Sequence, residues 1–149
     1  LSRTGLKDKT TYYAFDFWAN KPLPNLSGSF AWELPSESCK VIAVRAKSNH
    51  PVVVSTSQHI TQGMIDLVKE DWAGESLSGT SKIIAGDPYE LRIAGMNDGG
   101  NWKLANASLV GNPKGVSIEV LPQVEKGWLR VVIKGQESQV VKWKLKFKK

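Results

Sequence analysis

The chain has 149 residues, and a domain of this size buries roughly two thirds of the surface that its unfolded chain exposes. Hydrophobic residues make up 41% and charged residues 23% of the sequence, a globular composition that excludes a disordered, collagen-like or coiled-coil chain. No apolar run approaches the roughly 20 residues that cross a bilayer, so we expect no membrane partner. A complete (β/α)8 barrel needs about 250 residues, which excludes a self-contained enzyme of that class.

The formal net charge of +6 is concentrated near the C-terminus. Residues 126–149 contain eight Lys or Arg side chains against Glu137 alone, so the rest of the chain is nearly neutral. Between residues 141 and 148, lysine alternates with Val, Trp, Leu and Phe, which predicts a strand with lysine on its solvated face or at a protected sheet edge. No aromatic residue is interleaved on the lysine face to stack on bases, so we expect no nucleic-acid partner.

Most of the chain consists of short alternating or β-branched segments bounded by Gly, Pro, Asn and Asp, which is typical of an antiparallel all-β fold. We therefore expect one antiparallel β-sandwich domain over residues 1–149. The proline-rich residues 21–25 are predicted as a loop inside it. The expected strands cover residues 11–18, 29–34, 40–46, 52–56, 82–85, 89–94, 102–108, 116–121, 128–134 and 139–147.

Residues 60–72 are ambiguous between helix and strand. Apolar residues at positions 60, 64, 67, 68 and 72 fall at helical spacing, whereas those at 65 and 67 alternate with polar residues. A turn at residues 73–76 would permit a hairpin with residues 77–81, which agrees better with the all-β surroundings. We therefore favour a strand.

Alternation along the strands also predicts the inward-facing side chains. The expected core contains Phe15, Phe17, Val41, Ala43, Val53, Ile83, Leu91, Ile93, Val131, Ile133, Trp143, Leu145 and Phe147.

Few residues carry the chemistry of an enzyme. Cys39 is the only cysteine, which excludes an internal disulfide, and metal-binding spacings and phosphate loops are absent, so we expect no metal ion and no cofactor. His59 lies in a polar segment where hydroxyl and imidazole groups could converge, although local backbone bonding is the commoner role of such residues. We predict no catalytic residue, and we expect the available carboxylates to be solvated surface acids: Asp16, Asp66, Glu70, Asp71 and Asp87.

Six tryptophans are many for a chain of this length. A Trp side chain can stack on the apolar face of a sugar ring, but it also fills sandwich cores. We expect the tryptophans to pack in the core or between domains, and any exposed one to be Trp18 or Trp72, because each of these two ends a strand beside a polar loop. A patch that includes these two residues and is rimmed by His59 and Gln62 is the predicted surface for contact with another domain or with a sugar.

Five segments lie in order along most of the chain: residues 13–18 (YAFDFW), 34–44 (LPSESCKVIAV), 55–63 (STSQHITQG), 86–91 (GDPYEL) and 141–143 (VKW). Together they resemble the C-terminal region of bacterial melibiase-like (α-galactosidase-like) glycoside hydrolases. In that group a (β/α)8 barrel carries the catalytic aspartates and an antiparallel β-sandwich follows it. The barrel aspartates have no counterpart here and are not carried onto Asp16 or Asp87.

The resemblance implies a non-catalytic accessory domain, a C-terminal fragment of a larger enzyme, that packs on and stabilises an upstream catalytic barrel. That enzyme would act on α-linked galactosides, and the family suggests a periplasmic or extracellular location. Two other classes stay open. One is an autonomous carbohydrate-binding module that uses exposed tryptophans, and the other is a small β-fold enzyme.

Overall fold

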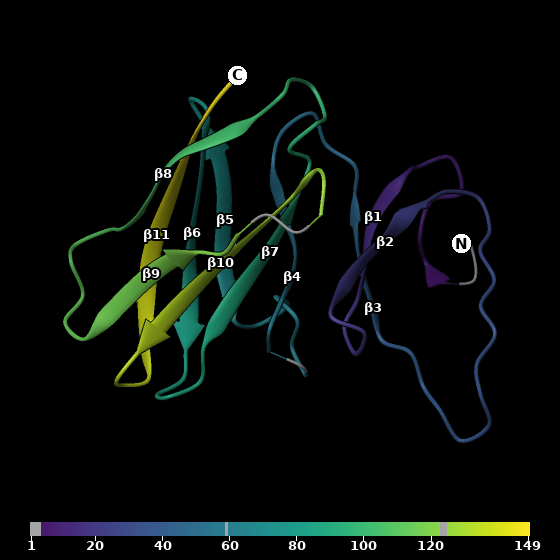
Figure 1. The fold of residues 1–149 in the computed structure, drawn as a ribbon, viewed down its shortest axis with the longest axis horizontal. Coiled ribbons are helices and arrows are strands. Elements are labelled where there is room, and N and C mark those ends of the chain that lie inside the picture. The colour runs from purple at the N-terminus through teal and green to yellow at the C-terminus, as the bar shows by residue number, and fades with distance from the viewer. Residues whose placement is uncertain (1–3, 59, 123–124) are drawn as a thin grey trace. The chain divides into compact units, whose positions relative to one another are not determined.

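The computed structural model of the chain describes residues 4–58, 60–122 and 125–149, which form antiparallel β-sheets joined by turns and loops (Figure 1). The predicted all-β class is therefore confirmed. By compactness the chain divides into two units, Leu1–Lys47 and Ser48–Lys149. The expectation of a single domain over residues 1–149 stays a prediction.

The first unit is a three-stranded antiparallel sheet in the order β2-β1-β3. Its strands are β1 (Tyr12–Asp16), β2 (Lys21–Leu26) and β3 (Ile42–Ala46). Every residue of the central strand β1 is buried, and a small apolar cluster forms around Tyr12, Ala14 and Leu26. Of the core residues predicted here, Phe15 is buried, whereas Phe17, Val41 and Ala43 are half-buried.

Two predictions for the first unit are wrong. The proline-rich residues 21–25 lie in a strand rather than a loop, which is possible because β2 is an edge strand and its prolines need not donate to a second neighbour. Residues 29–34 form no strand, although Phe30, Trp32 and Leu34 alternate with other residues. Alternation gives a segment one apolar face, but a strand also needs a neighbouring strand to which its backbone can bond. Residues 29–34 have no such neighbour, because the sheet of this unit consists of β2, β1 and β3 alone.

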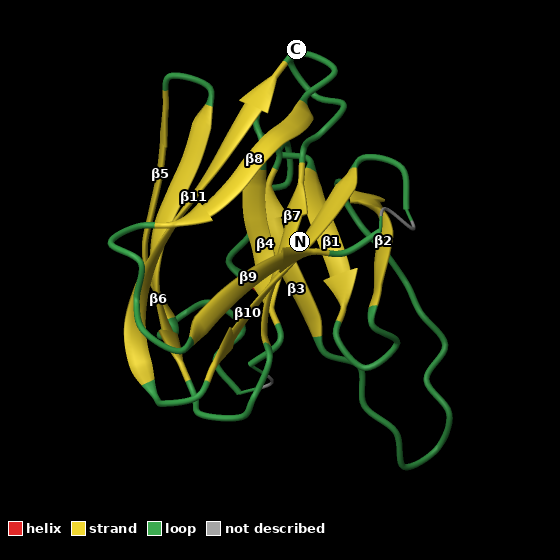
Figure 2. Cartoon of the chain, turned by 60° about the vertical axis from the view of Figure 1, so that its left-hand side comes forward, coloured by secondary structure: helices red, strands yellow, loops and turns green. Residues whose placement is uncertain are grey.

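The second unit is a β-sandwich of two four-stranded antiparallel sheets, which Figure 2 shows from the side. We call one the Tyr89 sheet, in the order β4-β7-β10-β9, and the other the Trp143 sheet, in the order β5-β6-β11-β8. The strands of the Tyr89 sheet are β4 (Val52–Thr56), β7 (Tyr89–Ala94), β9 (Val116–Val120) and β10 (Trp128–Gly135). Those of the Trp143 sheet are β5 (Leu67–Ala73), β6 (Ser76–Ile83), β8 (Lys103–Leu109) and β11 (Gln139–Lys148).

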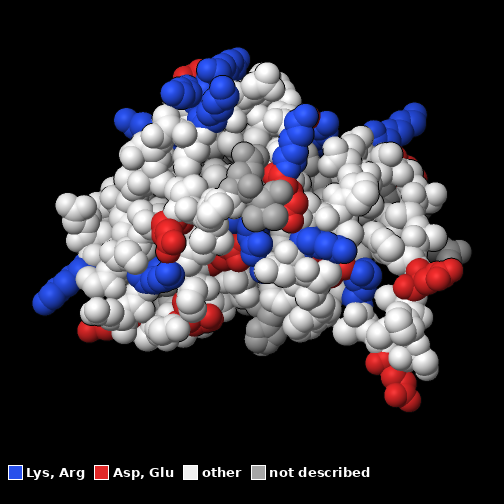
Figure 3. Space-filling view, viewed as in Figure 1, with Lys and Arg blue, Asp and Glu red and all other residues white. Residues whose placement is uncertain are grey.

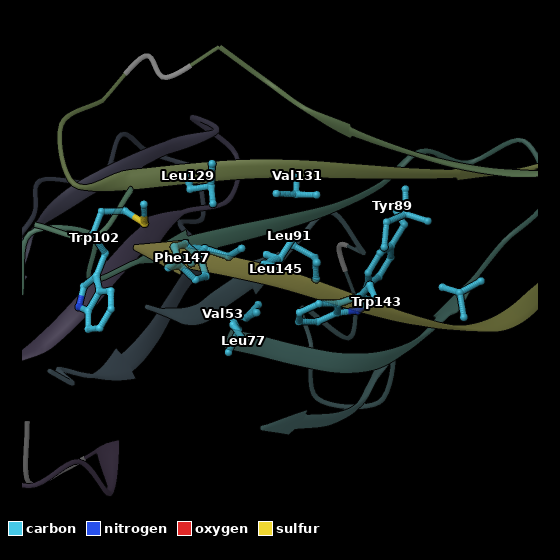
Figure 4. Close-up of a cluster of buried hydrophobic side chains, with 14 of the residues drawn as sticks. Val53, Leu77, Tyr89, Leu91, Trp102, Leu129, Val131, Trp143, Leu145 and Phe147 are labelled. Atoms are coloured by element: carbon cyan, nitrogen blue, oxygen red, sulfur yellow. The ribbon is translucent and has the colours of Figure 1, made fainter. Parts of the chain in front are cut away.

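The core of the sandwich lies between the two sheets, where side chains of β7 and β10 face those of β6 and β11 (Figure 4). Nine residues predicted from alternation belong to this core, so the assigned inward faces of these strands are correct: Val53, Ile83, Leu91, Ile93, Val131, Ile133, Trp143, Leu145 and Phe147. The sequence prediction missed further core members, among them Leu77, Tyr89, Met96, Trp102 and Leu129.

Trp143 is the largest fully buried side chain, and a glycine on the neighbouring strand makes room for it. Gly79 pairs with Trp143 in the sheet, and a Cβ atom at Gly79 would lie 2.2 Å from Cζ2 of the indole. The indole Nε1–H donates to Ser81 Oγ over 2.9 Å, which satisfies the one polar atom of the ring. Any larger residue at position 79 would collide with the indole, so burial of Trp143 requires glycine at this position.

Residues 60–72 resolve into turns followed by a strand. β5 and β6 form a hairpin, in agreement with the favoured prediction for the end of this segment. The hairpin turns through Gly74 and Glu75, which both have positive φ, 53° and 59°. Positive φ at both central residues is typical of the tight turn that matches the twist of paired strands.

β11 carries the alternating lysines. Its residues Val141, Trp143, Leu145 and Phe147 are buried, and the intervening lysines are exposed or half-buried. The strand lies between β6 and β8, so the lysines occupy a solvated sheet face. The alternative of a lysine-protected edge strand is therefore wrong.

We expect Trp143→Ala to lower the free energy of unfolding by about 3–5 kcal/mol, since it removes the largest buried side chain and leaves a cavity beside Gly79. Chemical denaturation measures this loss. The matched control is Trp18→Ala, whose side chain is 57% exposed and whose removal should change stability by about 0.5 kcal/mol or less. Equal effects of the two substitutions would contradict the inward face assigned to β11.

Candidate functional site

The predicted surface residues are divided between the two units of the chain. Trp18 is 57% exposed, as expected, and belongs to the first unit, whereas Gln62 and Trp72 belong to the second. His59 lies outside the described residues. Gln62 is half-buried in the loop that precedes β5, with a positive φ of 43°.

Trp72, one of the two tryptophans expected to be exposed if any is, is half-buried and packs in an aromatic cluster. Its ring stacks on His50 at 4.7 Å and 7° and meets Trp102 edge-on at 5.2 Å. The ring of Phe147 lies 5.7 Å from that of Trp72, tilted by 40°. Trp72 ends β5 on the inward face, so its position beside a polar turn did not make it a surface residue.

Gln62 and Trp72 also lie at opposite ends of β5. Gln62 precedes Leu67, the first residue of the strand, by five positions, and Trp72 is its penultimate residue. Five residue steps along a strand cover about 17 Å. The two side chains therefore do not form one contact surface.

The loop between β4 and β5 is built around the buried carboxylate of Asp66, which is 6% exposed. Thr56 Oγ1 and Tyr89 Oη donate to Oδ2 over 2.7 and 2.8 Å. The backbone N–H of Gly63 donates to Oδ1 over 2.8 Å, and the hydroxyl of Thr61 donates to the same oxygen. Two hydroxyl groups of the segment, those of Thr56 and Thr61, thus converge on a carboxylate, and the expectation that Asp66 is a solvated acid is wrong.

These bonds determine the titration of the cluster. Burial alone would raise the pKa of Asp66, but the hydrogen bonds from Thr61, Thr56, Tyr89 and the Gly63 N–H outweigh it and hold the pKa below its ordinary value of 3.8. Burial, with the charge of Asp66, raises the pKa of the Tyr89 hydroxyl. At neutral pH the carboxylate is therefore an acceptor and the phenol a donor.

The Asp66 loop is tied to neighbouring loops at the same end of the sandwich. Gln58 Nε2 donates to Asp87 Oδ2 over 3.0 Å, and Ser57 Oγ donates to the carbonyl of Pro88 over 3.0 Å. The N–H of Ala85 donates to Ser138 Oγ over 2.9 Å, which joins the loop before β7 to the turn before β11. Three loops therefore form one hydrogen-bonded surface.

Exposed apolar side chains gather on this surface and at the adjoining strand ends. Of the eight large apolar side chains that are exposed in the described part of the second unit, six lie here, whereas Val110 lies beside Lys142 on the Trp143 sheet and Val120 ends β9. Ile60 is 83% exposed, Met64 89% and Ile65 62%. We call the set the apolar end: Ile60, Met64, Ile65, Val68, Ile84 and Val140.

The first unit has exposed apolar side chains of its own. Phe30, Trp32 and Leu34 are 42%, 36% and 54% exposed, and the rings of Phe30 and Trp32 contact each other at 4.5 Å between centroids. These residues lie in the segment between β2 and β3, where the predicted strand does not form. Alternation in the sequence predicted that these three side chains share one face of a strand, but the segment that carries them is a loop.

Asp16, in the first unit, is a second carboxylate that the sequence wrongly placed on the surface. It is 1% exposed, forms an ion pair with Lys40 and accepts the Ala19 N–H over 3.0 Å. Burial would raise the pKa of Asp16, but the bonds from Lys40 and Ala19 and the charges of Lys40 and Lys21 outweigh it and lower the pKa. Glu70, Asp71 and Asp87 are at least partly accessible, as expected.

A buried ion cluster crosses β7 and β10, and the sequence analysis missed it. Glu90 accepts two bonds from the guanidinium of Arg130, one of them 2.9 Å from Nη2, and its Oε2 lies 3.8 Å from Nε of Arg92. Arg92 Nη1 donates to the carbonyl of Thr56 over 3.0 Å. Burial lowers the pKa of Arg92 to about 10, against the opposing charge of Glu90, so the group stays charged at neutral pH.

Among the described residues, no group of three or more His, Cys, Asp or Glu side chains is arranged to hold a metal ion. In the same part of the chain, no helix has the length and hydropathy that crossing a membrane requires.

We expect Asp66→Asn to destabilise the fold by about 1–3 kcal/mol at neutral pH, because the amide places a donor where the wild-type oxygen accepts bonds. The pKa of Asp66 is lowered in the fold, so its contribution is present above pH 3.8 and is lost as the pH falls through the folded pKa. Denaturation from pH 7 to pH 2 should therefore show a shallower acid loss in the variant. Asp71→Asn, at an exposed carboxylate, is the control, and parallel curves for wild type and Asp66→Asn would contradict the assignment.

Comparison with known proteins gives no family for the chain: no protein-family model, no curated protein and no solved structure matches it. The resemblance to melibiase-like enzymes therefore stays a hypothesis, and a functional assignment depends on the surfaces described above.

Proposed function

We propose that the chain is a non-catalytic accessory domain of an α-galactosidase-like glycoside hydrolase, and that it packs on the catalytic barrel of that enzyme and stabilises it. The observation that supports this proposal most is the apolar end of the sandwich. Exposed apolar patches on a folded protein mark surfaces that contact other proteins, and interdomain contacts bury roughly 600–1,500 Å².

The apolar end has the rigidity that a docking surface needs. Its most exposed side chains, Ile60 and Met64, lie in the loop that the carboxylate of Asp66 holds with four hydrogen bonds. A loop fixed in this way loses little conformational entropy when it docks. The cost of exposing Ile and Met to water is offset if a partner covers them.

The arrangement of the buried acids also supports a non-catalytic role. Asp16, Asp66 and Glu90 are each bonded to donors of the fold itself. A general acid or a nucleophile must instead face a substrate. A small β-fold enzyme is therefore the least favoured of the three classes.

The autonomous carbohydrate-binding module, in the form that uses Trp18 and Trp72, receives less support. Trp72 is half-buried among His50, Trp102 and Phe147, and His50 stacks on one face of its ring. Trp18 is exposed but contacts Phe17 edge-on, with 5.1 Å between centroids.

The first test is the unfolding midpoint of the chain alone and of the same chain joined to the region that precedes it in the reading frame. We expect the joined protein to unfold at a higher temperature than the chain alone, because docking stabilises only the folded state. The double variant Ile60→Ser/Met64→Ser should remove that gain. Its effect on the chain alone should be about 0.5 kcal/mol or less, since both side chains are exposed.

Val120→Ser is the matched control, because Val120 is exposed at 41% but lies outside the apolar end. The proposal is contradicted if no barrel-sized region precedes the chain, or if joining it leaves the midpoint unchanged.

Calorimetric titration with galactose, melibiose and galactan should give no saturable heat that depends on Trp18. Saturable binding lost in Trp18→Ala would favour the carbohydrate-binding module.

A further inference from the structure

We propose that the pocket beside Trp102 and Trp128 binds a saccharide that carries a carboxylate group. The pocket lies in the second unit, at the open edge between the two sheets, where β8 of the Trp143 sheet faces β9 and β10 of the Tyr89 sheet. Its volume of about 580 Å³ falls within the range of small-molecule sites.

The floor of the pocket is the end of the sandwich core. It is formed by apolar side chains that also pack between the sheets: Met96, Trp102, Leu104 and Leu129. Trp128, which is half-buried, adds a second indole to the wall. An apolar floor with two aromatic rings suits the flat C–H face of a sugar ring.

The rim of the pocket is polar and positively charged. Four exposed side chains supply it, two amides and two ammonium groups: Asn97, Asn101, Lys103 and Lys126. Lys149 Nζ lies over the Trp102 ring, 5.0 Å from its centroid, and brings a third positive charge near the pocket. Figure 3 shows Lys and Arg side chains gathered at the end of the sandwich that carries the C-terminus.

Among the described residues that line the pocket, none is acidic. The nearby Glu125 interacts electrostatically with Arg130. The hydrogen bond to Glu90 raises the pKa of Arg130, as do the charges of Glu90 and Glu125, while burial opposes them. Asn side chains donate to and accept from hydroxyl groups, and lysines attract a carboxylate. A uronic-acid sugar combines the apolar ring face, the hydroxyls and the negative charge that this lining would recognise.

Backbone hydrogen bonds hold the pocket in shape without a ligand. Trp102 N–H donates to the carbonyl of Met96 over 2.7 Å, and Met96 N–H donates to that of Gly127 over 3.3 Å. The Trp102 indole N–H donates to the carbonyls of Asn49 and Asp98 over 3.3 and 3.1 Å, which fixes the orientation of the ring. A preformed site binds at a lower entropic cost.

The pocket and the apolar end are independent proposals. β10 starts at the pocket with Trp128 and ends at Gly135, next to the loops of the apolar end. The length of this strand separates the two by about 23 Å. Docking on a barrel can therefore fail while saccharide binding succeeds, and the reverse is equally possible.

The test is a titration of the full chain, followed by amide and indole NMR, with D-galacturonic acid and its α-1,4-linked dimer. We expect saturable chemical-shift changes at Trp102, Trp128 and Asn101. Galactose and the α-1,4-linked galactose dimer, which lack the carboxylate, should bind at least about tenfold more weakly. The double variant Lys103→Gln/Lys126→Gln should weaken binding of the acidic sugars by about tenfold or more, with little effect on the neutral ones.

Lys142→Gln/Lys146→Gln is the matched control, because it removes the same charge from the outer face of β11 and should leave binding unchanged. Asn101→Asp places a negative charge on the rim and provides a second variant that should weaken acidic sugars selectively. The proposal is overturned by the absence of saturable shifts, by equal binding of acidic and neutral sugars, or by equal competition from sodium acetate.

Discussion

The carboxylate of Asp66 is the point at which the chain is fixed as it passes from one sheet of the sandwich to the other. The Oδ2 atom of Asp66 accepts hydrogen bonds from Thr56 and Tyr89 of the Tyr89 sheet. The backbone carbonyl of Asp66 accepts the N–H of Lys82 of the Trp143 sheet. The other carboxylate oxygen, Oδ1, accepts bonds from Thr61 and from the Gly63 N–H and so holds the loop itself. A buried carboxylate is stable only if donors surround it, so loop shape, sheet spacing and Tyr89 orientation are determined together.

The two ends of the sandwich share their strands and differ in their loops. At the Asp66 end, short connections present Ile, Met and Val to solvent, whereas at the other end the connections present Asn and Lys around a floor of core side chains. The core supports both surfaces, since Trp102 and Leu129 belong to it and also line the pocket. Loops can therefore differ in chemistry while the packing beneath them stays the same.

Sequence alternation was informative wherever one face of a strand meets the core. It predicted β4 and β7 to the residue and placed Trp143 and Phe147 inward, because burial on one face imposes a period of two. Alternation failed for residues 29–34, where the pattern has no neighbouring strand. The surroundings of Trp72 were not predicted either, because His50 and Trp102 lie far away in the sequence. The acids were misplaced for the same reason: the donors that bury Asp66 include Tyr89, on another strand.

The place of β11 has a consequence for how the protein is made. This strand follows all the others in the sequence, yet it lies between β6 and β8, and Trp143 pairs with Gly79 across more than sixty positions. A ribosome therefore releases β6 and β8 long before the strand that joins them exists, and their inner edges stay open until then. Open strand edges pair readily with other chains. Synthesis that stalls before residue 139 should therefore yield an aggregating product, because the strand whose solvated face carries the alternating lysines is then missing from the middle of the sheet.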